Sequence, residues 1–444
     1  AGILHYLSET QHHKLNHITS INRIPIEGHV WLDKFTMRNL EIFYPNTLEG
    51  KCLIDVIDNT ISPMGGRLLK RWLALPSTDK SLIFKRHNIV EYFISSESDR
   101  NLVCEMLSTL SDIERLVSKV ATKRIMPREL FNLNSSLKII KPLKNKLKKT
   151  ECKDLNKLIK SLSNCEQFIQ KIDSTLSENP PVNINKGNSI SSNFSDELKE
   201  LRSLSKNTKD FLEDMLKEQS EITKIPSLKI SSNNVFGYYI EVRNTHKDKV
   251  PESWIRKQTL VNAERYITEE LKDYETKILG AEQRIMELEI KIFDDLLDFC
   301  QSHILEIQNN SLIIAQLDCL TSFSNLSISK NYVRPEIDDS LDIEIINGKH
   351  PVIESQLPID KPYIPNSITL NSEQQQIIMI TGPNMSGKSA ILRQTAIICL
   401  LAQIGCFVPA EKLKMGIIDK IFTRVGASDN ISMGESTFMV EMNE

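Results

Sequence analysis

Apolar residues recur at helical spacing in several segments between about residues 62 and 292, and after Tyr332 the pattern changes to short strands and turns. Residues 62–76 predict a helix that Ser62 caps, with Pro63 in its first turn and Pro76 after its end. From there to about residue 175 the spacing stays helical with few Gly or Pro. Residues 178–195 form a polar stretch rich in Pro, Asn and Ser, which predicts a loop. The pattern therefore predicts an all-α core followed by a break.

A heptad seam follows this break. Apolar residues alternate at steps of four and three through about seven helical turns, at Ile267, Leu271, Tyr274, Ile278, Ala281, Ile285, Leu288 and Ile292. An upstream run has the same register, with a polar break at Thr208 and an end at Pro226; its members are Leu201, Leu204, Phe211, Met215 and Ile222. We expect two antiparallel helices that form an arm. The alternative, two ordinary core helices, is disfavoured by the length of the second seam.

The segment between these two helices has a β pattern. Residues 227–243 predict two strands around Asn233 and Asn234, a turn-prone pair. Residues 235–242 are rich in aromatic and β-branched side chains, which favour strands. We therefore expect a β-rich insert at the distal tip of the arm.

Composition limits the class of protein. A chain of 444 residues with 40% hydrophobic and 25% charged residues is typical of a multidomain globular protein and excludes a disordered chain or a small stapled scaffold. Its eight cysteines include no C-x-x-C pair, which favours free thiols in a reducing cytosol over disulfides or a zinc site. There is no apolar run of membrane-spanning length and no signal-peptide pattern. We expect a cytoplasmic protein with no membrane partner.

The overall net charge of −3 hides two basic segments. Residues 138–160 contain nine lysines against two acids, a local net charge of +7. This segment is either a solvated helix face or a DNA-facing surface. Residues 224–265 contain eight basic and four acidic residues, a net charge of +4 at the expected tip. This bias favours contact with a phosphate backbone over base reading, with a solvated surface as the alternative.

The clearest chemical motif lies near the end of the chain. Gly382–Ser389 match G-x-x-x-x-G-K-S after the apolar run 377–380, which predicts a buried parallel strand, and before a predicted helix, 388–404. This strand, loop and helix context is that of a P-loop. Its glycines let backbone N–H groups surround phosphate oxygens, Lys388 reaches the β and γ phosphates, and Ser389 supplies a ligand to Mg²⁺. The alternative is a glycine-rich turn with an incidental lysine.

The acidic partner motif of a P-loop ATPase does not follow. Phosphoryl transfer needs an apolar strand that ends in Asp and usually Glu, and no such segment occurs between Arg393 and Glu444. Asp419 has only two apolar residues before it, so we expect it at a strand end or turn. The sequence also begins at Ala1 and stops within a predicted helix at Glu444. We expect a fragment that lacks Walker B and has no complete catalytic site.

Several segments together resemble the MutS family of bacterial DNA mismatch-repair sensors. The P-loop segment TGPNMSGKS is followed by RQTA, VPA and FTRVGASDNISMGESTFMVEM, which are similar to the family's ATPase domain. The earlier segments TMRNLEI, SPMGGRLLKRWL, GYYIEV, RKQTLVNAERYITEELKDYE and INGKHPVIE resemble its core, lever and clamp in the same order. The resemblance covers nearly the whole chain.

The resemblance implies roles for matching residues. Asn384 is expected near the γ-phosphate, Tyr363 is expected to stack on adenine, and Ser436 is expected to reach the partner's nucleotide across a dimer. The implied ATP or ADP site is Gly382, Pro383, Asn384, Met385, Ser386, Gly387, Lys388, Ser389, Tyr363 and, in trans, Ser436, with Ser389 on Mg²⁺. The implied DNA-backbone contacts are Lys247, Arg256, Lys257 and Asn262. Ser386 and Ala390 depart from the family loop, which has Gly and Thr there.

The resemblance also implies a fold, a domain order and a function. The fold is multidomain and mainly α, with a β-rich clamp insert and a C-terminal α/β P-loop ATPase domain of the ABC type. The expected boundaries are a helical core at 1–195, a lever helix at 196–225, the clamp at 226–266, the returning lever and core at 267–330, and the truncated ATPase domain at 331–444. Mismatch-reading and connector domains would precede Ala1.

The implied full-length protein is a DNA-dependent ATP hydrolase of DNA mismatch repair. It would bind mismatched duplex as a homodimer, exchange ADP for ATP, become a sliding clamp and recruit MutL at the cytoplasmic nucleoid. For this chain we expect no appreciable hydrolysis. One alternative is an SMC-like coiled-coil DNA-binding ATPase, although such proteins carry the P-loop before the coiled coil. Others are a non-enzymatic DNA-binding interaction protein and a MutS paralogue without mismatch recognition.

Overall fold

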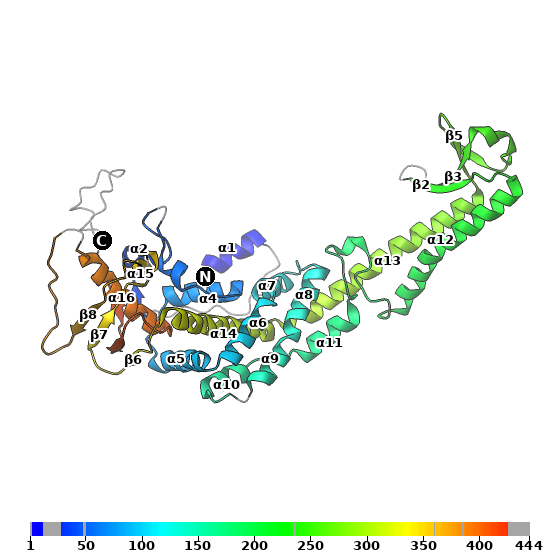
Figure 1. The fold of residues 1–444 in the computed structure, drawn as a ribbon. Coiled ribbons are helices and arrows are strands. Elements are labelled where there is room, and N and C mark those ends of the chain that lie inside the picture. Colours follow the sequence, from blue (N-terminus) through cyan, green and yellow to red (C-terminus); the bar gives the residue numbers. More distant parts are fainter. Residues whose placement is uncertain are drawn as a thin grey trace. The chain divides into compact units, whose positions relative to one another are not determined.

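The computed structural model describes the chain at residues 2–11, 28–47, 50–148, 150–233, 237–358, 360–383 and 386–424. The predicted site residues Asn384, Met385 and Ser436 lie outside these ranges. The chain divides into two compact units (Figure 1). The first unit comprises 1–122, 135–165 and 304–444, and the second comprises 123–134 and 166–303. Mainly helical architecture with small sheets confirms this part of the predicted fold class.

The first unit is organised around the helix α14, Ile304–Lys330. This helix is buried on nearly every side because it packs against α4 (Pro63–Ala74), α5 (Lys80–Ser95), α6 (Glu97–Ser108) and α7 (Ile113–Ala121). The predicted helix at 62–76 is α4, Pro63–Ala74, with Ser62 as its N-cap. The remaining helices of this helical part are α1 (Gly2–Gln11), α2 (Lys34–Asn39), α3 (Leu53–Ile57), α5 (Lys80–Ser95), α6 (Glu97–Ser108), α7 (Ile113–Ala121), α9 (Ile140–Leu147) and α10 (Lys153–Lys160). Helix α8, Pro127–Lys138, is divided between the two units.

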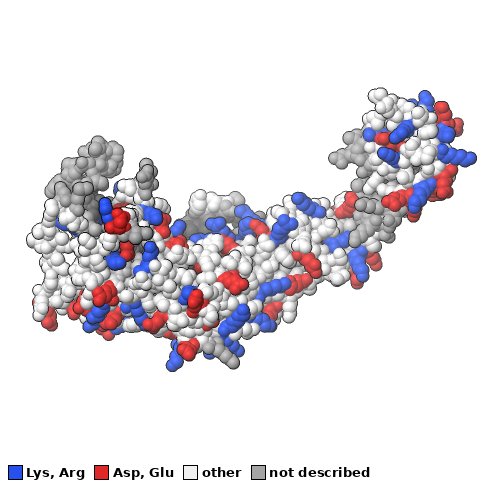
Figure 2. Space-filling model, viewed as in Figure 1, with Lys and Arg blue, Asp and Glu red and all other residues white. Residues whose placement is uncertain are grey.

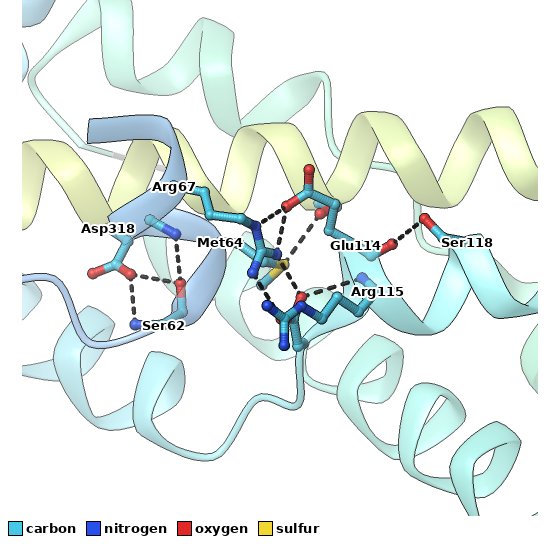
Figure 3. A network of polar contacts seen from close by, with 10 residues as sticks. Ser62, Met64, Arg67, Glu114, Arg115, Ser118 and Asp318 are labelled. Carbon is cyan, nitrogen blue, oxygen red and sulfur yellow. Dashed lines mark hydrogen bonds and ion pairs between the residues drawn. The ribbon is translucent and has the colours of Figure 1, made fainter. Parts of the chain in front are cut away.

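Polar contacts fix α4 against its neighbours (Figure 3). The Asp318 carboxylate of α14 accepts hydrogen bonds from the backbone N–H of Ile61 at 2.9 Å and of Ser62 at 2.7 Å. On α4 itself, Arg67 donates to both carboxylate oxygens of Asp112, at 2.9 and 2.7 Å, and pairs with Glu114. A two-point guanidinium–carboxylate contact fixes orientation as well as distance. These contacts connect α4 to both α14 and α7.

The C-terminal part of the first unit contains a four-stranded sheet in the order β6–β9–β7–β8. Strand β9 pairs parallel with β6 and antiparallel with β7, and β7 pairs antiparallel with β8. Its strands are β6 (Glu336–Ile337), β7 (Ile343–Gly348), β8 (Asn366–Leu370) and β9 (Lys412–Met415), with the short helix α15 (Pro351–Gln356) after β7. Separately, β1 (Trp31–Leu32) pairs parallel with β10 (Lys420–Ile421) directly after Asp419.

The predicted strand at 377–380 was wrong. These residues are not in a strand, and the side chains of Ile377 and Met379 are 86% and 87% exposed. A strand needs a neighbour that takes up its backbone hydrogen bonds, and within the described part of the chain no strand pairs with this segment. An apolar run alone does not supply that neighbour.

The predicted helix after the P-loop is α16, Lys388–Ile404. Every residue from Ile397 to Ile404 in its second half is buried, whereas Leu392 in its first half is 50% exposed. The helix packs against β7 as well as α4 and α5, so its second half is enclosed. The amide of the buried Gln403 is satisfied there by the carbonyl oxygens of Ser77 and Ile418 and by the N–H of Ile418.

The second unit contains the arm. Helices α12 (Asp196–Thr223) and α13 (Glu269–Gln301) lie side by side (Figure 1). At 1.5 Å per residue they are about 42 and 50 Å long. Met215 shares a core with Leu271 at one end, while Arg202 pairs with Glu289 further down, so the helices run antiparallel as predicted. The unit also contains α11 (Glu166–Thr175) and η1 (Ile184–Lys186).

A four-stranded antiparallel sheet lies at the end of this arm, in the order β2–β3–β5–β4. Its elements are β2 (Lys229–Asn233), β3 (Gly237–Arg243), η2 (Asn244–Lys249), β4 (Ile255–Thr259) and β5 (Ala263–Ile267). The predicted pair of strands at 227–243 corresponds to β2 and β3. Its core joins the sheet to the helix ends, through Met215, Ile225, Leu228, Ile240, Val242, Trp254, Tyr266, Ile267 and Leu271.

The predicted heptad seam is confirmed in part. Leu271 and Ala281 are buried on α13, and Met215 is buried on α12. Ile267 is buried as well, but it is the last residue of strand β5 and precedes α13, so its place in the helical seam was wrong. Ile222 is 63% exposed, so its place in the seam was wrong. The helix ends one residue later, and Lys224 turns the chain with a φ of +55°, which directs Ile225 into the core instead. The side chains of Leu204, Tyr274 and Ile278 lie outside the described part.

Candidate nucleotide and DNA sites

Gly387, Lys388 and Ser389 of the predicted P-loop lie at the start of α16. Gly387 is the N-cap residue with a φ of +88°, a backbone conformation that favours glycine. Because Gly387 has no side chain to cap the helix, the first N–H groups of α16 are left for another acceptor. Ser386 adopts no positive φ, so this departure from the family loop needs no left-handed backbone. This arrangement suits an anion at the helix start.

Lys388 and Ser389 occupy the first turn of α16. The Lys388 ammonium donates to the carbonyl oxygens of Gly382 and, at 2.9 Å, of Pro383. The Lys388 side chain therefore lies across the loop that would also surround a bound phosphate. The side chain of Ser389 is exposed, so its hydroxyl is open to a metal ion or a phosphate. Within the described residues, no group of three or more His, Cys, Asp or Glu side chains could hold a metal by itself.

Tyr363 lies against the same helix. Its hydroxyl donates to Gln394 Oε1 at 2.9 Å, and the Gln394 Nε2 donates to the carbonyl oxygen of Asn366 at 3.4 Å. Burial raises the pKa of Tyr363, so the phenol stays protonated at neutral pH. The structure thus brings Tyr363 to the P-loop helix, about two turns beyond the predicted phosphate ligands.

Sequence reasoning missed Gln394 and two charged neighbours. Gln394 is fully buried, but it stands between Arg393 and Thr395, so its neighbours in the sequence gave no signal of this burial. Arg393 pairs with Glu41 at 2.8 Å, although the two residues are far apart in sequence. Burial, and then the charge of Arg393, lower the pKa of His350 to about 4, so this imidazole is neutral at neutral pH. Its ring nitrogen caps α15.

The four predicted DNA contacts all lie in the β-rich segment at the end of the arm, with Arg256 and Lys257 in β4, Lys247 in η2 and Asn262 in the turn between β4 and β5. Asn244 connects two of them. Its backbone N–H donates to the Asn262 carbonyl oxygen, and Asn244 is the first residue of η2, which contains Lys247. Lys257 is the extra residue of a bulge in β4, between Arg256 and the next paired residue. Lys247, Lys257 and Asn262 are exposed.

Arg256 differs from the other three residues. It forms an ion pair with Glu264 at 3.5 Å, and Glu264 also accepts a hydrogen bond from the hydroxyl of Tyr266. Arg265 is similarly paired with Glu241 and stacks on Tyr239. Their charges are therefore partly compensated within the sheet. The remaining basic side chains of this segment are exposed at Lys224, Lys229, Arg243, Lys247, Lys249 and Lys257.

Both basic segments lie on exposed surface. Figure 2 shows Lys and Arg on the sheet at the end of the arm, with Asp and Glu nearby. On α9 and α10 of the first unit the exposed lysines include Lys141, Lys146, Lys153, Lys157 and Lys160. Lys144 differs, because its ammonium donates to the carbonyl oxygen of Leu162.

All eight cysteines are free thiols, six of them buried. None of the helices that the structure describes is long and apolar enough to span a lipid bilayer.

Comparison with known proteins identifies relatives over the whole chain. Residues 35–324 match the family described as MutS domain III, and residues 378–444 match MutS domain V. The DNA mismatch repair protein MutS of Flavobacterium johnsoniae is 57% identical over 443 residues, which cover 100% of this chain and 51% of the relative. The same-named proteins of Flavobacterium psychrophilum and Bacteroides fragilis are 58% and 52% identical with the same coverage. The chain spans about half the length of these relatives.

Proposed function

The chain belongs to the MutS family, and on that premise we propose that it holds the lever, the DNA clamp and the first part of the ATPase domain of a DNA mismatch repair protein. One observation carries this proposal. A single chain combines a basic sheet at the end of a paired-helix arm with a P-loop at the start of a buried helix. This combination suits a protein that holds a polyanion in one place and a nucleotide in another.

The sheet at the end of the arm is the proposed DNA contact. Lys257 is exposed on its strand β4, and Lys247 and Asn262 are exposed on the segments that connect its strands. Lysine ammonium groups attract phosphates without reading base sequence. Arg256 contributes less in this proposal, because Glu264 already compensates its charge. The duplex would thus be held through its backbone, and mismatch reading would come from elsewhere in the full-length protein.

The start of α16 is the proposed ATP or ADP site. Lys388 would exchange its two carbonyl partners for the β and γ phosphates, and the exposed hydroxyl of Ser389 would bind Mg²⁺. Bound Mg²⁺ would supply charge that stabilises the phosphates. Tyr363 would stack on adenine, since a half-buried phenol ring presents a flat apolar face. Asn384 near the γ-phosphate, and Ser436 reaching a nucleotide on a second copy, complete the proposal.

The full-length protein would act on mismatched duplex as a homodimer, exchange ADP for ATP to become a sliding clamp, recruit MutL, and work at the cytoplasmic nucleoid. For the 444-residue chain we propose nucleotide binding without appreciable hydrolysis, because no apolar strand ending in Asp-Glu follows the P-loop in this sequence. A phosphate-release assay tests the proposed lack of hydrolysis. Turnover that Lys388→Ala abolishes would contradict it.

Duplex binding at several salt concentrations tests the clamp. The slope of log affinity against log salt is negative, and each lost phosphate contact reduces its magnitude by about 0.9. We expect Lys247→Ala with Lys257→Ala to reduce the magnitude of this slope by about 2 and to weaken binding of matched and mismatched duplexes equally. The matched control is Lys153→Ala with Lys160→Ala on α10, which removes the same charge from the other basic segment. An equal effect of the control pair would contradict a clamp-specific contact.

Nucleotide binding is tested separately by thermal unfolding. We expect ADP and ATP with Mg²⁺ to raise the melting temperature of the chain and Lys388→Ala to remove that shift. A non-enzymatic interaction protein with a vestigial loop would show no shift in either variant.

A further inference from the structure

A buried glutamine of the P-loop helix holds the phenol of Tyr363. Gln394 is 0% exposed, and its amide is engaged at both ends. Its Oε1 accepts the Tyr363 hydroxyl at 2.9 Å, while its Nε2 donates to the Asn366 carbonyl oxygen at 3.4 Å. Since a backbone carbonyl can only accept, the amide nitrogen must face Asn366 and the amide oxygen must face Tyr363. One orientation of the amide is therefore selected.

Two strand ends and the helix leave just enough space for this amide. Gly348 ends β7, and it pairs in register with Asn366 at the start of β8. A Cβ atom at Gly348 would lie 2.8 Å from Gln394 Nε2 and 2.6 Å from the side chain of Ile345. Only glycine admits the amide here. The backbone of the sheet, and not a mobile side chain, thus fixes the far end of the glutamine.

The ring that this glutamine holds is half-buried, so part of it is open to solvent. Gln394 comes six residues after Lys388 in the same continuous helix. At 1.5 Å per residue this separation is about 9 Å along the axis, which is comparable with the reach of a purine nucleotide from its terminal phosphates to its base. Rigid helix geometry therefore sets the spacing between the P-loop and the ring.

We propose that Gln394 is a positioning residue that fixes the Tyr363 ring for contact with the base of a purine nucleotide bound at Lys388. The inference rests on the proposed nucleotide function and goes beyond it, because it assigns base recognition to the contact of Gln394 with Tyr363. An aromatic ring held at its hydroxyl loses less rotational freedom when a base stacks on it. Without the amide the ring would move about its side-chain torsions, and only the contribution of the base would weaken.

The test compares two ligands on the 444-residue chain. ATP presents a base and three phosphates, whereas inorganic tripolyphosphate presents the phosphates alone. We expect Gln394→Leu, a substitution of similar size, to weaken ATP binding about fivefold to tenfold, the size of one lost hydrogen bond, and to leave tripolyphosphate binding unchanged by calorimetry. Tyr363→Phe keeps the ring and the buried amide, and it should cause a similar loss.

The double variant and a matched control separate positioning from stability. Gln394→Leu in a Tyr363→Phe background should cause no further loss, because both changes remove the same contact. Gln403→Leu is the control, since it removes another buried amide of the same helix that contacts Ser77 and Ile418. It should change the two ligands by the same factor.

The outcomes are distinct. Equal weakening of ATP and tripolyphosphate by Gln394→Leu, or additive losses in the double variant, would overturn the positioning role while leaving nucleotide binding intact. Should Gln394→Leu fail to fold, an unchanged ATP affinity in Tyr363→Phe would overturn the role by itself. If the unmodified chain bound neither ligand, the proposed nucleotide site itself would be wrong and the positioning role would fall with it.

Discussion

Arg202 and Glu289 form a buried ion pair that joins the two helices of the arm. The Arg202 Nη2 and Glu289 Oε1 atoms are 2.5 Å apart, and the side chains are 14% and 1% exposed. Glu289 also accepts the backbone N–H groups of Asn188 and Ser189, each at 2.9 Å. The same carboxylate thus connects both helices to the loop that precedes them.

We predict that Glu289→Ala loosens the arm strongly. Removing one partner of a buried pair leaves an uncompensated charge and typically costs about 3–5 kcal/mol. Hydrogen exchange should show faster exchange for amides of α12, of α13 and of the loop at Asn188. The control is Glu197→Ala, which breaks the exposed pair with Arg284 between the same helices and should cost less than about 1 kcal/mol. Equal effects of the two variants would contradict the importance of burial.

Local signals in the sequence predicted those parts of the structure that depend on neighbouring residues. Ser62 and Pro63 start a helix because capping and proline geometry act within one turn. The β2–β3 hairpin and the start of α16 after the glycine-rich loop follow from similarly local chemistry. The predicted strand at 377–380 was wrong because a strand also needs a partner strand, which apolar composition does not specify.

Side-chain partners distant in sequence were not predictable from the pattern. Gln394 lies 31 residues from Tyr363, and Glu289 lies 87 residues from Arg202. Periodicity indicates which residues face inward, but it does not say which buried polar group meets which. The sequence placed Tyr363 and Lys388 in one candidate site through family resemblance alone. The hydrogen bond between Tyr363 and Gln394, which places Tyr363 against the helix that begins at Lys388, could be known only from the fold.

We predict that His87 makes stability fall in mild acid. His87 is 0% exposed, and burial, followed by the charge of Arg334, lowers its pKa to about 3. Below the ordinary pKa of 6.5 the unfolded chain therefore binds a proton that the folded chain does not. The free energy of unfolding should fall as pH falls from 6.5 towards 3, by up to about 1.4 kcal/mol per pH unit.

Urea unfolding between pH 5 and pH 7 measures this dependence while most carboxylates stay ionised. His87→Phe should flatten the slope by about one proton, because the aromatic contact with Phe407 can be kept while the titrating group is lost. His350 has a pKa lowered to about 4 and contributes in the same direction, so some slope should persist. An unchanged slope in His87→Phe would show that His87 is not held neutral.

We predict that Gly65→Ala destabilises the first unit. An added Cβ would lie 2.2 Å from the Oδ2 atom of Asp318, which is already held by Ser62. Overpacking of this kind costs typically about 1–3 kcal/mol. Gly66→Ala is the matched control in the same helix, since its nearest neighbour would be 3.3 Å away. The control should stay within about 1 kcal/mol in thermal unfolding, and a comparable loss would contradict the steric explanation.

We predict that Arg86→Lys weakens the attachment of the far end of the P-loop helix. The Arg86 guanidinium lies 3.6 Å from the ring centre of Trp72, and its Nη1 donates to the Ile404 carbonyl oxygen at 2.8 Å, in the last turn of α16. Lysine keeps the charge but loses the planar stacking and the fixed donor geometry. Gly405 lies so close that an added Cβ would be 2.4 Å from the Arg86 Cβ, so a repositioned side chain has little room.

The expected loss of stability in Arg86→Lys is about 1–2 kcal/mol in thermal unfolding. The control is Lys80→Arg at a half-buried cation lying 5.8 Å from the centre of the Phe84 ring, where little change is expected. If Arg86→Lys is as stable as the unmodified chain, the stacked guanidinium does not hold this helix end.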